Sequence, residues 1–284
     1  MQNLPQINRE KTSMSTLVDL TSVFEGIASM HIYKIKNQVL QSQNFFERLW
    51  QMYTQVRVGN TFGYGRRVAD VKVVDKELFI AITGEGNFSG DIDQRLIDWM
   101  LKSYDPSKND IIVIGHHGAI QLAQRDIGFE KYFKMPAKDQ SVNTTPIIKE
   151  IQNYKSTAVY YQTYVSLTVQ DVKRINLKMV IEEQGEEIEK GKDVINEATY
   201  IFEPNAFAVV DHLERSMMNI AVSQVILESK LAQYASRFQA MTEAHTKASD
   251  TFDELKTTYR RSLRAIKDEV LKEIINGRRK AVHV

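Results

Sequence analysis

The stretch that decides the fold is LESKLAQYASRFQAMTEAHTKASDTFDELKTTY, residues 227–259. Apolar residues recur in it at alternating steps of four and three. We take as the seam Leu227, Leu231, Phe238, Met241, Phe252, Leu255 and Tyr259, with Tyr234, His245 and Ala248 between them on the same face. A seven-residue repeat sustained over this length predicts a helix that supercoils around a partner helix.

The repeat changes after Tyr259, where the steps become four, three, four and four through Leu263, Ile266, Val270 and Ile274. An interval of eleven residues, such as that from Leu263 to Ile274, favours a straight or slightly right-handed course. We therefore expect the end of this helix to leave the supercoil.

Residues that break helices are scarce at both ends of the chain. Residues 6–58 hold no proline and only Gly26, and residues 205–284 hold no proline and only Gly277. Because proline breaks helix interiors and glycine weakens them, the chain divides into an N-terminal coiled-coil helix, a central domain and a long C-terminal coiled-coil helix. The expected bounds are 14–58, 66–204 and 205–284.

The N-terminal helix carries a matching but less regular stripe. It runs through Leu17, Leu20, Phe24, Ile27, His31, Ile35, Val39, Phe46, Leu49, Tyr53 and Val56. At about 1.5 Å per residue, residues 14–57 would span roughly 65 Å and residues 206–281 roughly 115 Å. The excess length of the second helix must stand alone or sit inside another protein.

The middle of the chain is typical of an α/β domain. Apolar runs at 78–83 and 110–115 predict buried strands, and 92–103 has helical spacing between them. A strand–helix–strand unit implies that its two strands are parallel. Further strands are expected at the end of the domain, at 156–166, 174–181 and 197–202, with a charged turn at 184–193.

The composition narrows the class of function. Lys plus Arg total 37 and Asp plus Glu 36, so the net charge of +1 gives no support for nucleic-acid binding. The absence of cysteine excludes disulfides and thiolate sites, and no run of 18 apolar residues is present to span a membrane. We expect no cofactor, no metal and no catalytic residue, because no Ser-His-Asp order or paired carboxylates suggest an active site.

Two short motifs have both a chemical and a structural interpretation. The turn Gly84–Gly90 follows a strand and precedes a helix, which suits phosphate binding, but it lacks the P-loop lysine and Asp91 would repel an anion. His116 and His117 follow the next strand, but metal ligands are usually spaced more widely. A tight turn and a strand-to-helix loop are the expectations. His31 and His245, on the apolar stripes, are expected to pack between the helices.

The C-terminal end of the chain is strongly basic. Asp268, Glu269 and Glu273 interrupt a cluster formed by Arg260, Arg261, Arg264, Lys267, Lys272, Arg278, Arg279 and Lys280. Taken alone, the cluster is a solvated helix face with charge that suits a helix C-terminus.

Residues 231–281 resemble the C-terminal helix of gamma subunits of F-type ATP synthases. The first part of the family pattern is matched by Ser236, Arg237, Phe238, Ala240, Met241 and Ala244, and the second by Tyr259, Leu271, Glu273, Ile274, Ile275 and Gly277. The stretch Tyr200–Pro204, the turn with Thr83, Gly86 and Gly90, and the Ile114, Gly115 and Gly118 motif also resemble the family in order along the chain.

The resemblance implies an antiparallel coiled coil of the two terminal helices with a Rossmann-like α/β domain between them. It implies a central-stalk rotor that couples ion-driven rotation to conformational change at the catalytic beta sites, without catalysis of its own. The implied partners are the alpha and beta subunits, the epsilon subunit and the c-ring, and membrane association only through the c-ring. The implied place is the cytoplasmic face of a membrane, most simply a bacterial inner membrane.

The resemblance also implies contact residues. Contacts with the alpha and beta ring fall on Arg261, Leu263, Arg264, Asp268 and Glu273. Contacts of the domain with the epsilon subunit and c-ring fall on Tyr200, Phe202 and Glu203.

The sequence departs from the family pattern in several places. Glu85 and Phe88 replace the arginine and cysteine of the turn, Leu263 and Arg264 replace an arginine–glutamine pair, and Asp268 replaces a threonine. An F-like motor adapted to another task is therefore an alternative. A small phosphate-binding enzyme and a coiled-coil protein without a motor are the other classes that remain open.

Overall fold

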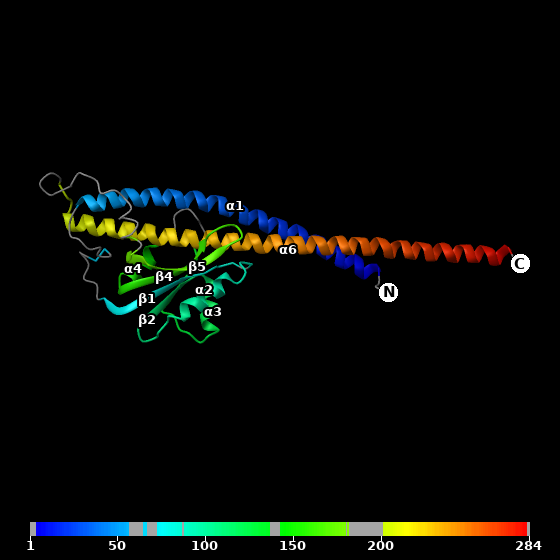
Figure 1. The fold of residues 1–284 in the computed structure, drawn as a ribbon, viewed down its shortest axis with the longest axis horizontal. Helices are drawn as coiled ribbons and strands as arrows, with labels where there is room; N and C mark the ends of the chain where they lie inside the picture. The colour runs from blue at the N-terminus through cyan, green and yellow to red at the C-terminus, as the bar shows by residue number, and fades with distance from the viewer. Residues whose placement is uncertain are drawn as a thin grey trace. The chain divides into compact units, whose positions relative to one another are not determined.

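The computed structural model describes residues 4–56, 65–66, 73–86, 88–136, 143–179, 181 and 201–282 (Figure 1). In chain order the elements are α1 (Leu4–Val56), β1 (Val74–Ile82), α2 (Ile92–Leu101), β2 (Asn109–Ile114), α3 (His116–Ala123), β3 (Lys131–Phe133), α4 (Thr145–Ile151), β4 (Tyr154–Tyr164), β5 (Gln170–Asn176) and α6 (Ala206–Val282). The chain forms two compact units, one of residues 1–27 with 238–284 and one of residues 28–237. Each unit is described by itself below.

The second unit contains a five-stranded sheet in the order β3-β2-β1-β4-β5. Strand β1 pairs in parallel with both β2 and β4, β2 pairs in parallel with β3, and only the β4–β5 pair is antiparallel. The predicted strand–helix–strand unit with parallel strands is thus confirmed in β1, α2 and β2. The mixed α/β class is confirmed with it.

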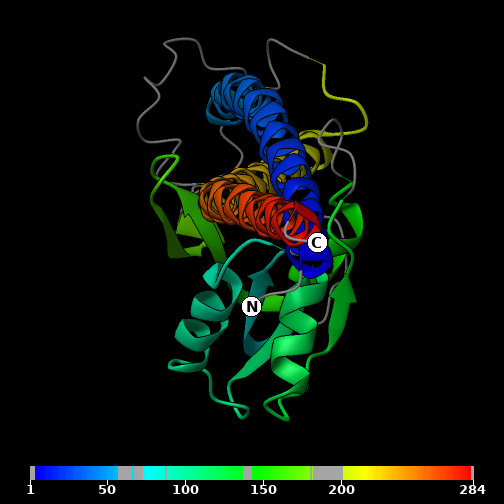
Figure 2. The ribbon, with the colours of Figure 1, turned by 90° about the vertical axis from the view of Figure 1, so that its right-hand side faces the viewer.

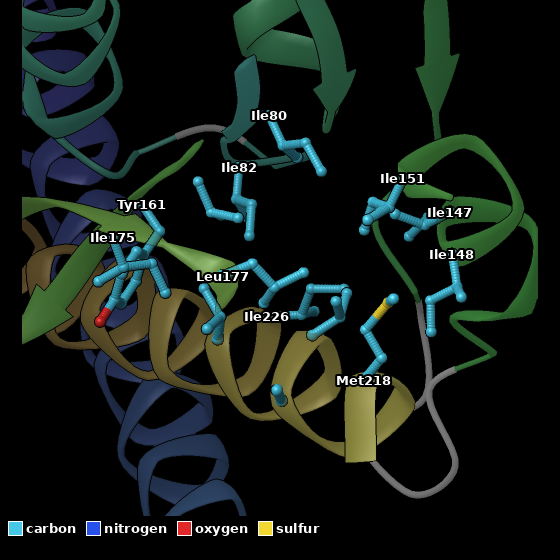
Figure 3. Packing of buried hydrophobic residues seen from close by; sticks show 14 of the residues in the cluster. Ile80, Ile82, Ile147, Ile148, Ile151, Tyr161, Ile175, Leu177, Met218 and Ile226 are labelled. Carbon is cyan, nitrogen blue, oxygen red and sulfur yellow. The ribbon is translucent and has the colours of Figure 1, made fainter. Parts of the chain in front are cut away.

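The two faces of the sheet support two separate cores. Leu78, Ile80 and Ile82 of β1 belong to a core completed by α4 and by the 217–226 part of α6 (Figure 3). Phe79 and Ala81, which alternate with them, belong to a second core formed with α2 and α3. Figure 2 shows the corresponding layers, with α2 and α3 on one side of the sheet and the yellow part of α6 on the other. Burial on both faces explains why residues 78–82 of β1 form a continuous apolar run.

Several predicted strand bounds were wrong. The strand predicted at 174–181 is β5, which begins earlier, at Gln170, and ends at Asn176. Its first residues are polar because β5 is an edge strand, so the search for apolar runs missed them. The Asn176 side chain accepts a hydrogen bond from the backbone N–H of Lys178, 3.1 Å away, and helical residues follow there.

The end of the domain also differs from the prediction. Ile201 and Phe202 lie in no strand, whereas residues 197–200 and the charged turn at 184–193 lie outside the described residues. The short elements β3 and α4 and the helix α3 were not predicted individually. They have three, seven and eight residues, which is too short for a clear apolar period.

In the unit of residues 1–27 and 238–284, α1 and α6 run antiparallel. Lys11 Nζ lies 4.4 Å from the ring centroid of Tyr259. Further along α1, the Thr21 hydroxyl lies 3.3 Å from Nδ1 of His245, and Glu25 accepts a hydrogen bond from the Thr242 hydroxyl at 2.9 Å. Residues progressively later in α1 therefore contact residues progressively earlier in α6, as antiparallel helices require.

In the unit of residues 28–237 the helices show the same antiparallel pairing. The rings of His31 and Tyr234 stack with centroids 4.4 Å apart. Ile35 is buried in a cluster with Leu227 and Leu231. Near the far end, the Tyr53 hydroxyl donates a hydrogen bond of 3.2 Å to Glu214. The predicted packing role of His31 is confirmed here, as is that of His245 in the other unit.

The face that α1 buries differs in part from the predicted one. Leu17, Leu20, Phe24 and Ile27 are 46%, 52%, 38% and 42% exposed, so their assignment to the buried stripe was wrong. Ile35 and Phe46 of the predicted stripe are buried, at 0% and 3% exposed, and three positions outside that stripe, Ile7, Thr21 and Ala28, are buried as well, at 1%, 6% and 0%. Thr21 lies against His245 of α6, and a search for large apolar residues overlooks small side chains such as Thr21 and Ala28.

Along α6 the burial declines toward the C-terminus. Of the seam residues, Leu227, Leu231 and Met241 are buried, whereas Phe238, Phe252, Leu255 and Tyr259 are half-buried. Ala248, between them, is also buried.

Candidate functional site

Several polar side chains of the domain lie together at the carboxyl end of the parallel strands. Gly84 follows β1, His117 lies in the first turn of α3 after β2, and Gln162 lies near the end of β4. Strand β1 separates β2 from β4, so the order of the parallel strands reverses at this point. In open α/β sheets, ligands bind in the crevice outside the carboxyl ends of strands at such a switch point.

Close backbone packing fixes the loops at this edge. The hydroxyl of Thr83 lies 3.1 Å from the carbonyl oxygen of Ile114 and accepts a hydrogen bond from the backbone N–H of Gly118 at 2.9 Å. Gly115 adopts a φ of +101°, and a Cβ there would lie 2.1 Å from the carbonyl oxygen of Thr83. A residue with a side chain would therefore push the two loops apart.

Asp93, in the first turn of α2, is the hub of the site. The residue is 4% exposed, and its side chain accepts hydrogen bonds from the backbone N–H of Gly84 at 3.1 Å and from the amide of Gln162. Nδ1 of His117 lies 2.8 Å from the second carboxylate oxygen. The hydrogen bond to Asp93 raises the pKa of His117 above its usual value, although burial acts in the opposite direction.

Helix α6 contributes the remaining side chains of this hydrogen-bond network, which contact Gln162. The hydroxyl of Ser229 donates to the side-chain oxygen of Gln162, and the amide of Gln233 lies 3.3 Å from the same oxygen. Gln162 and Ser229 are fully buried, and Gln233 is 6% exposed. The crevice in which related sheets hold a ligand is thus occupied by side chains of the chain itself.

The glycine turn is likewise held by internal contacts. Glu85 accepts hydrogen bonds from the backbone N–H groups of His116 and Met135, at 3.1 and 3.3 Å, and from the Tyr132 hydroxyl. The guanidinium of Arg237 donates to the carbonyl of Gly86 at 3.2 Å. The turn is therefore held by hydrogen bonds to α3, to β3 and the segment after it, and to α6.

A second group of contacts fixes the end of the turn. The Ser236 hydroxyl donates to the carbonyl of Ser89 at 2.7 Å, which ties the turn to α6 a second time. Asp91 is exposed and pairs with Arg95 at 3.4 Å.

The two adjacent histidines have different surroundings. His117 bonds to Asp93, which is 24 residues away in sequence, whereas His116 is exposed at the start of α3. Among the described residues, no three His, Cys, Asp or Glu side chains are placed to hold a metal ion together.

The predicted ring-contact residues lie on the last turns of α6. Arg261, Arg264, Asp268 and Glu273 are exposed there, and Leu263 is half-buried. They share these turns with large exposed apolar side chains that are 45–61% accessible, namely Ile266, Val270, Leu271, Ile274 and Ile275. The change of apolar period after Tyr259 was the sequence signal for this surface, and it found Ile266, Val270 and Ile274.

The predicted foot-contact residues precede α6. Phe202 is half-buried and Glu203 is exposed, whereas Tyr200 lies outside the described residues. Ile201, which we had not singled out, is 94% exposed. An isolated exposed isoleucine has no period that would have marked it in the sequence.

The polar network itself was missed by the sequence analysis. Asp93 appears as an ordinary acidic residue in the first turn of a helix, and Ser229 as a small residue beside the seam. Only Gln162 carries a signal that could have marked it, because it interrupts the apolar strand VYYQTY. The described helices include none that is long and apolar enough to cross a membrane.

Comparison with known proteins agrees with this arrangement. A family model described as ATP synthase matches residues 3–279. The ATP synthase gamma chain of Pelotomaculum thermopropionicum is 24% identical and that of Staphylococcus aureus 22% identical, with 98% of each chain covered in both cases.

Solved structures share the fold. A chain in the Euglena gracilis mitochondrial ATP synthase OSCP/F1/c-ring structure has a TM-score of 0.64 at 16% identity and covers 99% of this chain and 96% of its own. A chain in the rotor structure of the same enzyme has a TM-score of 0.59 at 16% identity, with coverage of 93% and 99%. The two long terminal helices pair with each other, and the part of the chain that joins them in sequence forms the sheet. With a family match over nearly the whole sequence, these features lead to one assignment: the chain belongs to the ATP synthase gamma-chain family.

Proposed function

We propose that this chain is the central-stalk rotor of a rotary F-type ATP synthase or ATPase and is not itself catalytic. It turns within a ring of alternating alpha and beta subunits and joins that ring to an epsilon subunit and a c-ring. One asymmetric shaft biases three identical beta sites toward different conformations, and rotation carries that bias from site to site. Ion-driven rotation is thereby coupled to ATP synthesis or hydrolysis.

The observation that carries the proposal is the exposed end of α6. A helix end that displays five large apolar side chains together with arginines is unusual for a surface in water, because such stripes are normally covered. The exposed fractions of Ile266, Val270, Leu271, Ile274 and Ile275 support a location inside a sleeve of partner subunits. Arg261, Leu263, Arg264, Asp268 and Glu273 would make the remaining contacts with that sleeve.

The α/β domain, which we assign to residues 66–204, would remain outside the ring. Tyr200, Phe202 and Glu203 would contact the epsilon subunit and c-ring. The buried hydrogen bonds of Asp93, Gln162 and Ser229 support a structural role for the domain, since they fill the position where a nucleotide would bind. Attachment through the c-ring would place the chain at the cytoplasmic face of a membrane, and a bacterial inner membrane is the simplest case.

Reconstitution tests the proposal directly. The full chain alone should neither hydrolyse nor bind ATP in calorimetry, but it should raise steady-state ATPase activity when added to alpha and beta subunits. Glu85→Ala and Asp91→Ala should leave that activity nearly unchanged, because both residues lie in the domain. A micromolar ATP isotherm that disappears with Gly86→Ala would refute the rotor assignment of the turn.

An F-like motor adapted to another task is the second candidate. Where the family has arginine, Glu85 accepts three hydrogen bonds from the chain's own domain, and this departure from the family pattern favours the variant motor. Mass spectrometry of the complex purified through this chain distinguishes the two. Recovery of alpha, beta, epsilon and c subunits supports the synthase, and recovery of the alpha and beta ring with other subunits supports the variant motor.

A further inference from the structure

We propose that Asp93 and His117 form a pH-sensitive clasp that sets how firmly the α/β domain holds helix α6. Asp93, Gln162 and Ser229 form a continuous chain of hydrogen bonds from α2 through β4 to α6. The Asp93 carboxylate is the acceptor that orients the Gln162 amide. The oxygen of that amide then faces Ser229 and Gln233 on α6.

The geometry couples His117 to this chain through one shared acceptor. Nδ1 of His117 and the backbone N–H of Gly84 both approach Oδ2 of Asp93, at 2.8 and 3.1 Å, while Gln162 donates to Oδ1. A protonated imidazole makes a charge-assisted hydrogen bond to a carboxylate, which is about twice as strong as a neutral one. Loss of that proton removes the positive partner of a carboxylate that is buried beside α6.

The charges that face His117 come from three elements. Asp93 on α2 and Glu85 in the turn after β1 favour its protonated form, whereas Arg237 on α6 opposes it. The net effect raises the pKa of His117 in the folded chain, and the Asp93 hydrogen bond is the largest cause. Stabilisation from the pair is therefore fully present below a pH of about 6.5, the ordinary histidine value, and is lost as the pH rises through the folded pKa.

The clasp is independent of the proposed rotor function, since it concerns contacts within one chain. If the chain is a rotor, the clasp makes the attachment of the domain to the shaft firmer in acid than in alkali. Solution measurements on the full chain, without partner subunits, therefore test the clasp separately from the rotor.

The experiment compares two readouts on the same protein between pH 5.5 and 9. NMR of the histidine ring resonances follows the titration of His117, which the spectrum of His117→Gln assigns. Hydrogen exchange, corrected for the intrinsic pH dependence, follows the backbone amides of residues 226–236. We expect protection of these amides to fall about fivefold as the pH rises, with the same midpoint as the His117 titration.

Variants separate the clasp from general pH effects. His117→Gln should abolish the pH-dependent fall in protection of residues 226–236, which we call the step. His116→Gln, a change of the exposed neighbouring histidine, should leave the step in place. Asp93→Asn should lower the midpoint of the His117 titration, because the carboxylate that raises it is gone. Residues 245–257 of the same helix serve as an internal reference and should show no step at this midpoint.

Two results would overturn the clasp. One is a step in residues 226–236 that persists in His117→Gln. The other is a wild-type chain in which His117 titrates without any change in these amides. The second comparison is made on the wild-type chain, in which through-bond and NOE correlations can also assign the His117 ring, so the test remains decisive even if His117→Gln or Asp93→Asn folds poorly.

Discussion

Replacement of two isoleucines on α1 tests which face of this helix is buried. Ile35 and Ile27 lie on the same helix, and the sequence pattern placed both on the buried stripe. In the structure Ile35 is 0% exposed and packs with Leu227 and Leu231, whereas Ile27 is 42% exposed. Ile35→Ala and Ile27→Ala thus remove the same atoms from two different environments.

The expected costs differ several-fold. Ile35→Ala leaves a cavity between the helices, and such a change typically costs about 2–5 kcal/mol. Full burial of an isoleucine side chain stabilises by about 1.5–3 kcal/mol, and Ile27 achieves only part of that burial. Because alanine is the better helix former, by up to about 0.7 kcal/mol, the net cost of Ile27→Ala should stay below about 1 kcal/mol.

Urea unfolding of the full chain, followed by far-UV circular dichroism, measures both costs. With a slope of about 3 kcal/mol per molar urea, Ile35→Ala should lower the midpoint by about 1 M, and Ile27→Ala by about 0.3 M or less. The slope itself should not change. Equal midpoint shifts for the two variants would show that the assignment of the buried face is wrong.

Three further outcomes are expected. Gly115→Ala should prevent stable folding, because its φ is +101° and the new Cβ would lie 2.1 Å from a carbonyl oxygen, whereas Gly128→Ala has no atom within 4 Å and should melt within a few degrees of the wild type. Arg264→Ala should reduce coupling in rotation or ATPase assays without dissociating the complex, since exposed ion pairs contribute about 0–1 kcal/mol; loss of assembly would contradict this. Burial, with a smaller contribution from Asp110, raises the pKa of Tyr154 to about 12, so the stability that this group provides below pH 10 should be lost as the pH rises through 12. Ultraviolet titration of the wild type against Tyr154→Phe checks this value, and ionisation of Tyr154 near pH 10 would refute it.

The sequence alone determined the architecture of the chain. A heptad repeat over 227–259, ends without helix breakers and a middle of apolar runs predicted two long helices around an α/β domain. These features are local and periodic, so they can be read without any knowledge of contacts. The change of period after Tyr259 also marked the exposed apolar end of α6, since a helix without its supercoil partner needs a different spacing.

Tertiary structure alone decided which face of α1 is buried. Of the predicted stripe, Ile35 is buried, whereas Leu17, Leu20 and Ile27 are exposed, and the buried positions depend on where α6 lies. Thr21 and Ala28 are buried although their side chains are small. A search for apolar periodicity selects large residues as the buried positions. It contains no information on how closely two helices approach each other.

The polar clasp likewise depended on the fold. Asp93, His117, Gln162 and Ser229 come from four elements, α2, α3, β4 and α6, and nothing in their local sequence links them. The parallel sheet brings the ends of β1, β2 and β4 to one edge, and α6 covers that edge. Sequence determines which residues can ionise or donate a hydrogen bond, but only the packing of the elements determines which of them share one buried carboxylate.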